Sequence, residues 1–223
     1  MFDKNLEYWQ NKLTRLPVLE LTTDKLRSSE RDYEIGIETY VFPEELCESV
    51  KILSQSSDTL IFSSLLTVFK CLLHKYTGEE DIIVGSYIPQ SNNLDFNTLA
   101  FRSCVSGDIS FIELLKQVDA VVTEDLKHQD FSWNELVEKL SATDTQKDAG
   151  IFQVMFSLHF YDAIDTPLPI NIDEFQSDLA FFLLESKEGL KGTIAYNQEL
   201  FEAQTIKRLI NHFENLLTCV VEN

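Results

Sequence analysis

A junction between a helix and a strand lies in residues 74–85, which read HKYTGEEDIIVG. Apolar residues run almost without interruption from 59 to 76, a pattern that predicts a central buried helix with Thr59 as its cap. Gly78 is expected to end that helix, and the β-branched residues of 81–87 predict a core strand. Two buried elements of different type in direct succession favour an α/β domain.

The rest of the chain extends this pattern in both directions. Residues 33–42 alternate so that Ile35, Ile37, Thr39 and Val41 share one face, which predicts a half-buried strand. Pro43 is expected to open a helix at its first turn. Further helices are expected over 2–13, 110–127, 133–140 and 202–221, strands over 96–105 and 151–160, and a hairpin over 179–185 and 190–196. We therefore expect an α/β fold with a mixed β-sheet covered by helices.

Charge and hydropathy exclude several classes of partner. The 223 residues carry 18 Lys and Arg against 37 Asp and Glu, a formal net charge of −19. Nucleic-acid binding requires a basic stripe, and an anionic membrane surface repels an acidic chain, so neither is an expected partner. No apolar run approaches the ~20 residues that span a bilayer. We expect a cytoplasmic protein.

The cysteines predict neither a disulfide framework nor a metal site. Cys47, Cys71, Cys104 and Cys219 are scattered, with no CxxC and no paired histidine spacing. Cys71 and Cys219 fall within apolar helical patterns and are expected to be buried thiols. No phosphate-binding loop, dinucleotide fingerprint or HExxH is present, so no metal and no cofactor is expected.

Four histidines are the candidates for acid-base chemistry. His74 is expected to serve the carbonyl end of its helix, and His212 to be half-exposed. His159 precedes Asp162 in HFYD, one residue shorter than the acyltransferase pattern HxxxD. His128 heads His128-Gln129-Asp130 and is compatible either with a general base or with a network in which Asp130 or Ser132 caps the next helix. The residues alone therefore indicate an α/β domain without an obvious active site.

Six strings, in order, resemble the condensation domains of nonribosomal peptide synthetases. They cover nearly the whole chain: Tyr8-Trp9 with Leu13, residues 74–85, Asn97-Thr98-Leu99 with Arg102, His128-Gln129-Asp130, Phe152-Gln153-Val154-Met155-Phe156, and Tyr196-Asn197 with Leu200-Phe201. The resemblance implies that residues 1–223 form a partial condensation domain, the carboxy-terminal lobe of a chloramphenicol-acetyltransferase-like pair. It also implies an adenylation domain after this lobe in the full protein.

Departures from the family pattern fall at its catalytic features. The HHxxxDG motif of the first lobe is absent from these residues. The family's GRN turn is replaced by Gln90-Ser91-Asn92, so that Ser91 stands where the resemblance places an arginine that pairs with the catalytic aspartate. A later RDxSRxP element has become residues 144–150, in which Asp148 reverses a charge. Ser132 and Trp133 replace Pro and Phe.

Loss of both sides of that ion pair favours a noncatalytic lobe, because a buried unpaired aspartate costs several kcal/mol. Our preferred hypothesis is a scaffold or docking platform for an adenylation domain, a carrier protein or a tailoring enzyme of the same assembly line. The alternative is half of a split condensation enzyme, completed by an upstream lobe that supplies HHxxxDG. A third hypothesis is an unrelated small acyltransferase that uses His128 or His159.

Overall fold

The computed structural model describes residues 2–27, 34–89, 96–141, 150–160, 177–187 and 189–222. Its helices are α1 (Phe2–Lys12), α2 (Glu44–Ser57), α3 (Ile61–Thr77), α4 (Phe111–Lys127), α5 (Trp133–Ser141) and α6 (Ala203–Glu222). Its strands are β1 (Ile35–Val41), β2 (Asp81–Pro89), β3 (Phe96–Cys104), β4 (Val154–Phe160), β5 (Leu179–Ser186) and β6 (Gly189–Asn197).

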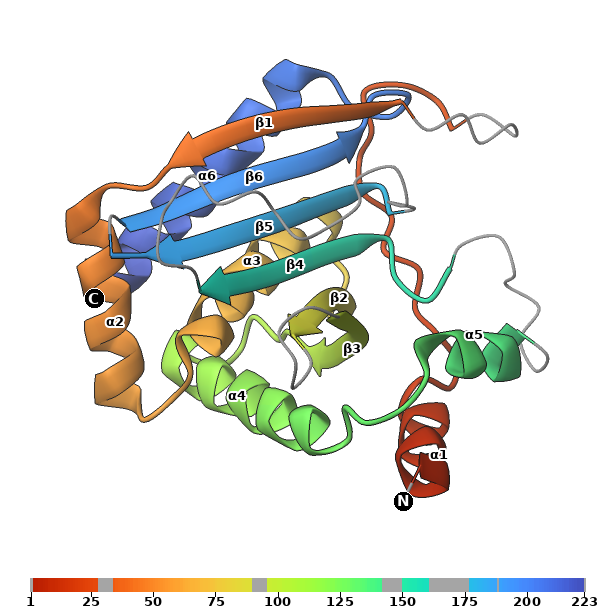
Figure 1. Ribbon diagram of the computed structural model, residues 1–223. Helices are drawn as coiled ribbons and strands as arrows, with labels where there is room; N and C mark the ends of the chain where they lie inside the picture. The colour runs from red at the N-terminus through yellow and green to blue at the C-terminus, as the bar shows by residue number, and fades with distance from the viewer. Residues whose placement is uncertain are drawn as a thin grey trace.

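The strands form one mixed sheet in the order β1-β6-β5-β4-β2-β3 (Figure 1). Strand β4 pairs in parallel with β2 and β5, and the other pairs are antiparallel. The predicted hairpin is confirmed, because β5 and β6 pair from Leu179–Tyr196 to Ser186–Gly189. Strand β4 begins at Val154, three residues later than the apolar run suggested.

Helices α3 and α6 lie behind the sheet in the view of Figure 1, and each contributes a phenylalanine to an aromatic cluster in the core. Phe69 of α3 lies 5.1 Å from Phe156 and 5.0 Å from Phe181, between ring centroids. Phe213 of α6 completes the group at 5.7 Å from Phe181. All four rings are fully buried. This contact explains why the apolar stripe of α6 is so regular.

The junction of residues 74–85 has the predicted form, but the helix that leads into it begins differently from the prediction. Gly78 ends α3 in the left-handed conformation, with φ of 76°, and its N–H donates to the carbonyl of His74. The predicted cap at Thr59 is wrong, because Leu60 occupies the cap position without a side-chain hydrogen bond. Instead, Asp119 of α4 accepts the Leu60 N–H at 2.9 Å. A side chain of a neighbouring helix therefore binds the backbone at the start of α3.

Edge strand β1 differs from its sequence prediction. Its apolar face was expected to be half-buried, yet Ile37 is 49% exposed and Val41 is 58% exposed. On the other face, Tyr40 donates a hydrogen bond of 2.6 Å to Glu214 of α6. Helix α6 thus covers the side of β1 that carries polar residues. The alternation was correctly identified, but the sheet turns its apolar side outward at this edge.

The predictions for two cysteines also need correction. Cys219 is exposed and Cys71 is only half-buried, while Cys47 is the buried thiol. Cys219 lies two residues beyond Leu217, the last member of the buried stripe of α6, and so falls on the outer side of the helix. An apolar run with no gaps does not reveal which of its members face outward.

A lysine is buried completely in the core beside the strand pair β2–β3. The ammonium of Lys70 in α3 donates to the carbonyls of Ile82 at 3.0 Å and Phe101 at 2.7 Å, and to the hydroxyl of Ser103 at 3.1 Å. All three N–H donors therefore have acceptors. Desolvation nevertheless disfavours the charged form and lowers the pKa of Lys70 to about 7.

Stability is therefore expected to depend on pH through Lys70. Between pH 7 and about 10 the unfolded chain binds more protons than the folded one, so the free energy of unfolding rises with pH. We expect the free energy of unfolding of wild type to rise, relative to that of Lys70→Met, by up to about 1.4 kcal/mol per pH unit in this range. Urea unfolding at pH 7, 8 and 9 measures the gain. Lys116→Met, at an exposed lysine of α4, is the control, and equal slopes for Lys70→Met and wild type would contradict the assignment.

Candidate functional site

The first two motif residues fasten α1 to the loop that follows α4. Trp9 is fully buried, and its indole N–H donates to the carbonyl of His128 at 2.8 Å. The ring of Tyr8 stacks on the imidazole of His128 with centroids 3.9 Å apart and planes 11° apart. The ring of Phe131 packs 5.4 Å from Trp9. Two motifs that are more than a hundred residues apart in sequence thus form one contact.

The imidazole of His128 lies between α1 and the end of α4. Its Nδ1 lies 2.9 Å from Oδ1 of Asn5, and the amide of Asn5 donates to the backbone carbonyl of Asp130 at 3.0 Å. Asp130 thus joins the network through its backbone, and the carboxylate near the other ring nitrogen belongs to Glu124, at 3.6 Å. The stacked and hydrogen-bonded imidazole thus contacts two chain segments, α1 and the loop after α4.

Asn97 ties the same loop to the sheet. Its side-chain amide donates to the backbone carbonyls of Gln129 at 2.7 Å and Phe131 at 3.0 Å. Its Oδ1 accepts the N–H of Thr98 at 2.9 Å, which fixes the orientation of the amide. Gln129 thus enters through its carbonyl, and Thr98 through its N–H. Because a buried carbonyl without a donor costs about 1–3 kcal/mol, Asn97 is a structural requirement of this loop.

A buried ion pair lies beneath this network. The carboxylate of Asp125 in α4 is fully buried, accepts a hydrogen bond of 2.7 Å from the hydroxyl of Tyr8, and pairs with the ammonium of Lys12. Desolvation raises the pKa of Asp125 and lowers that of Lys12, because burial disfavours both charges, and their attraction opposes both shifts. Burial and the hydrogen bond to Asp125 raise the pKa of Tyr8.

Sequence reasoning missed Asn5, Lys12 and Asp125. A signal for Asp125 was present, since it follows Val118 and Val122 on the buried stripe of α4, where a charged residue must be paired. Nothing comparable marks Asn5 or Lys12, which look like ordinary polar residues of an amphipathic helix.

Arg102 holds the carboxyl end of α1. Its guanidinium donates to the carbonyls of Lys12 at 2.9 Å and Thr14 at 2.8 Å, and it pairs with Asp81 at 2.7 Å. The last carbonyls of a helix have no partner within that helix, and the planar fork of Arg102 supplies one. Arg102 therefore connects the end of α1 to strand β3.

Gln153 binds the chain beyond α1, and Phe152 packs on strand β2. The Oε1 of Gln153 accepts the N–H of Leu19 at 2.9 Å. The ring of Phe152 covers Gly85 so closely that a Cβ atom at that position would overlap it. The motif that contains Phe152 thus packs directly on the last residue of the 74–85 stretch. On its other side Phe152 contacts Trp133, with ring centroids 5.6 Å apart.

Tyr196 and Asn197 lie near the strands and the turn that contact the chain around Asp24. The ring of Tyr196 covers Gly36 of β1, where no side chain fits. Asn197 accepts the N–H of Glu199 on its Oδ1 at 2.9 Å, which shapes the turn after β6. In that turn the carbonyl of Leu200 accepts the N–H of Asp24 at 2.9 Å.

Most of the motif residues lie in or around residues 2–27, which we call the N-terminal strap. Tyr8 and Trp9 belong to the strap, Arg102 and Gln153 hydrogen-bond to its backbone, and Asn97 binds the loop of His128, Gln129 and Asp130 that receives it. Asn197 shapes the turn that contacts Asp24, and Thr98, Phe152 and Tyr196 support the structure beside these contacts. Within the described part of the chain, these side chains mainly bind backbone groups and pack against neighbouring segments.

The other histidines have structural surroundings as well. His74 contacts the carbonyl of Glu79 at 2.8 Å, as its position at the end of α3 predicted, while His212 is exposed and lies 2.7 Å from the hydroxyl of Tyr76. His159 is buried against Phe96, and desolvation lowers its pKa to about 4. A base with so low a pKa is a weak proton acceptor at neutral pH.

Several sequence predictions lie outside the described residues. They are Ser91 with its neighbours Gln90 and Asn92, the segment 144–149 that contains Asp148, and Asp162. The two replaced residues at the start of α5 are described. Ser132 accepts the N–H of Glu135 at 3.4 Å and so caps α5, as one of the two interpretations of this loop predicted, and Trp133 packs between Phe131 and Phe152.

In the described part of the chain, no group of three or more His, Cys, Asp or Glu side chains is arranged to hold a metal ion. None of the helices described has by itself the length and apolar character to cross a membrane, although α2 and α3, bent by 106° at their junction, meet those criteria as a pair by length and composition alone.

Comparison with known proteins identifies relatives over the full chain. The condensation-domain family model matches residues 1–223. One of the linear gramicidin synthase proteins of Brevibacillus parabrevis is 33% identical over 240 residues, covering 99% of this chain and 3% of that protein. The chain therefore spans a small part of the curated relative that it matches. This result confirms the resemblance drawn from the six motifs.

Solved structures confirm the α/β fold class. A four-domain nonribosomal peptide synthetase bound to AMP and glycine has a TM-score of 0.86 at 20% identity, covering 99% of this chain and 19% of that chain. A complex of the X-domain and OxyB from teicoplanin biosynthesis has a TM-score of 0.85 at 20% identity, covering 100% of this chain and 53% of that chain. At this level of identity the likeness shows the fold alone.

The ion pair beneath the strap gives a stability prediction. Lys12→Met leaves the buried carboxylate of Asp125 without its cation and is expected to lower the free energy of unfolding by about 3 kcal/mol. The double variant Lys12→Met/Asp125→Asn keeps an acceptor for Tyr8 and removes both charges, so it should recover most of that loss. Urea unfolding of wild type and the two variants measures the difference. A double variant no more stable than Lys12→Met would show that the pairing is not what stabilises this region.

Proposed function

The chain belongs to the condensation-domain family of nonribosomal peptide synthetases, and from that premise we propose that residues 1–223 form a noncatalytic docking lobe. The lobe serves as a platform for another component of the same assembly line. We place it ahead of an adenylation domain, as the resemblance to peptide synthetases implies. Such a lobe contributes shape and contact surface rather than reacting groups.

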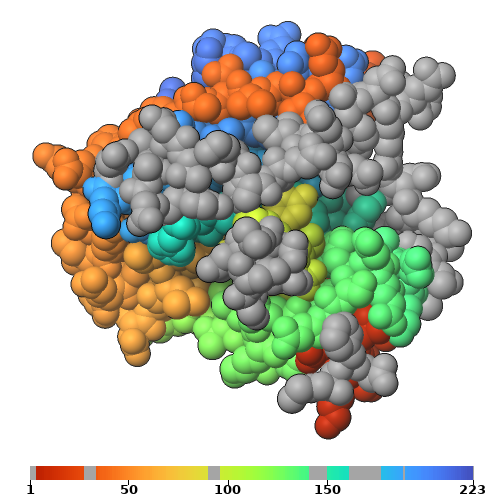
Figure 2. All heavy atoms as spheres, in the orientation of Figure 1, coloured from red at the N-terminus to blue at the C-terminus, as the bar shows by residue number. Residues whose placement is uncertain are grey.

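The observation that carries this proposal is the exposed apolar face of β1. Ile37 and Val41 point outward from an edge strand, on the side that α6 does not cover. In Figure 2, β1 forms an orange band along the upper edge of the molecule. Edge strands with exposed apolar side chains are prone to unwanted pairing, and natural proteins keep them covered or charged. An apolar strand face retained at an open edge therefore favours a partner that covers it.

The surroundings of the histidines support the noncatalytic part of the proposal. Within residues 1–223 the sequence contains no HHxxxDG motif. His128 is held by Tyr8 and Asn5, and the burial of His159 makes it a poor base. Several of the residues that resemble the family motifs, among them Arg102 and Gln153, bind the backbone of the strap.

The chemistry of the lobe narrows the choice of partner. Its net charge of −19 favours a partner with a basic patch, which increases the rate of association and improves specificity. The X-domain, which has a similar fold, is found in a complex with OxyB. We therefore rank a tailoring enzyme first among the three partners, ahead of a carrier protein or an adenylation domain.

The docking surface predicts which substitutions weaken binding. Ile37→Thr/Val41→Thr keeps both residues β-branched, so β1 should form, but it removes apolar contact area. We expect the dissociation constant for the partner to rise about tenfold or more, as for other buried interface anchors. Biolayer interferometry against the purified tailoring enzyme, carrier protein and adenylation domain of the same assembly line measures this. Ile112→Ala, at an exposed apolar residue of α4, should bind like wild type. Failure of all three proteins to bind would contradict the docking role.

A reconstitution assay tests the absence of catalysis. The lobe is mixed with an upstream lobe that contains HHxxxDG, a carrier-bound acyl donor and a carrier-bound amine acceptor, and amide formation is followed by mass spectrometry. We expect no product above the level given by the upstream lobe alone. Product that depends on this chain would contradict the proposal and support the split-enzyme alternative.

A further inference from the structure

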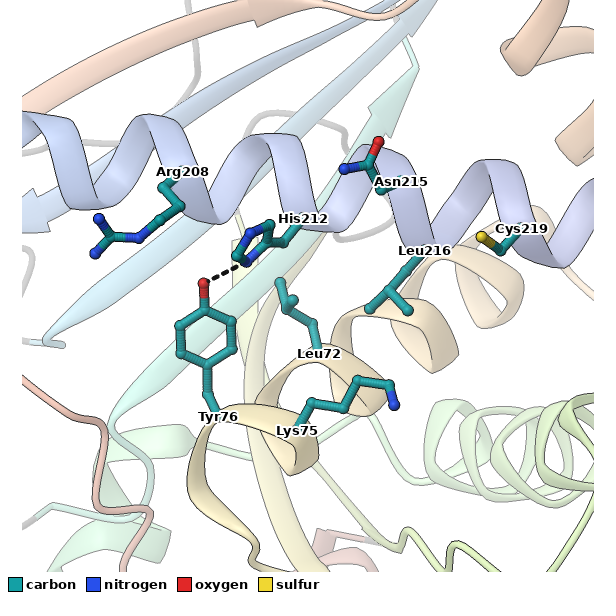
Figure 3. Close-up of a pocket in the computed structure, with 8 residues that line it drawn as sticks. All are labelled: Leu72, Lys75, Tyr76, Arg208, His212, Asn215, Leu216 and Cys219. Carbon is teal, nitrogen blue, oxygen red and sulfur yellow. Dashed lines mark hydrogen bonds between the residues drawn. The ribbon is translucent and has the colours of Figure 1, made fainter.

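A groove of about 630 Å³ separates the carboxyl half of α3 from α6 (Figure 3). Its volume lies within the range of small-molecule sites. Leu72 and Leu216 supply its apolar part, and Leu72 is fully buried. The complete lining is Leu72, Lys75, Tyr76, Arg208, His212, Asn215, Leu216 and Cys219.

The polar groups of the groove are mainly hydrogen-bond donors. Figure 3 shows Tyr76 and His212 directed at each other, with 2.7 Å between the hydroxyl and Nδ1. If the hydroxyl donates, the neutral imidazole keeps an N–H on its other nitrogen, and if the imidazole donates, the hydroxyl keeps its proton. In either tautomer the pair therefore retains one donor. Arg208 lies beside it with five N–H groups, one of which binds Thr205 at 3.0 Å.

The charge of the lining contrasts with that of the whole chain. Acidic residues outnumber basic ones by 37 to 18 in the sequence, yet the lining contains Lys75 and Arg208 and no aspartate or glutamate. Lys75 and Arg208 therefore attract an anion locally, although the net negative charge of the chain repels it elsewhere. Because an exposed ion pair contributes only about 0.2–1 kcal/mol, the anion alone is insufficient, and the ligand must also bury apolar surface.

We propose that this groove binds a small amphipathic carboxylate, either a medium-chain acyl acid or an aryl acid. The carboxylate lies between Arg208 and the Tyr76–His212 pair, and the apolar body rests on Leu216, with Leu72 beneath it. Lys75 and Cys219 mark the far end. Along α6 the distance from Arg208 to Cys219 is about 16 Å, at 1.5 Å per residue, which accommodates an extended chain. The proposal is independent of the docking role of β1.

Cys219 supplies a reporter, and Cys104 supplies its matched control. Both thiols are exposed, and only Cys219 lines the groove. Alkylation by N-ethylmaleimide is followed at each cysteine by mass spectrometry while octanoate is added. We expect octanoate to slow alkylation at Cys219 several-fold at saturation and to leave Cys104 unchanged. Octan-1-ol, which has the same chain without the charge, should protect less at equal concentration.

Two variants test the placement of the carboxylate. Arg208→Gln should raise the half-protecting concentration of octanoate about fivefold, the loss expected for an exposed ion pair, while Lys116→Gln should leave it unchanged. Backbone amide shifts of α3 and α6 provide a second measure of binding. Absence of both protection and amide shifts would overturn the proposal. Equal protection by octan-1-ol, or an unchanged response in Arg208→Gln, would do so as well.

Discussion

The buried carboxylate of Asp125 is the constraint on which the rest of the strap depends. A charge with no exposure to water requires a partner, and α1 supplies two of them, Lys12 and Tyr8. Once α1 is held there, Trp9 reaches the carbonyl of His128, and Asn97 can fix the loop that carries it. The motifs that identify the family thus belong to one continuous set of contacts, in which polar groups satisfy backbone atoms rather than substrates.

The sequence was sufficient for those parts of the fold that depend on local periodicity. The helix before Gly78, the core strand after it and the β5–β6 hairpin follow from apolar spacing and turn residues. The orientation of β1 could not be predicted in this way, because alternation shows that two faces differ but not which one a helix will cover. The cap of α3 was predicted wrongly for a related reason, since the acceptor of the Leu60 N–H, Asp119, comes from another helix.

The candidate site was predicted as a set of residues but not as an arrangement. Resemblance selected Tyr8, His128 and Asn97, which the structure places close together, whereas the contact between His128 and Asn5 has no signal in the sequence. A histidine followed by an acid suggests catalysis when only the residue types are known. Stacked on an aromatic ring, with Asp130 engaged through its backbone, the same histidine fastens two segments. The surface carries two other features, the exposed apolar side chains of β1 and the cations of the groove between α3 and α6.

Whether the strap is an integral part of this lobe is the central question, and the two tryptophans of the chain allow a direct measurement. In a Trp133→Phe variant, Trp9 is the remaining tryptophan and reports on the strap, while far-ultraviolet circular dichroism reports on the sheet and helices. Urea unfolding followed by both signals should give coincident transitions, because the strap and the core form one cooperative unit. A fluorescence transition at clearly lower urea would show that the strap detaches first, and it would contradict the role assigned here to the family motifs.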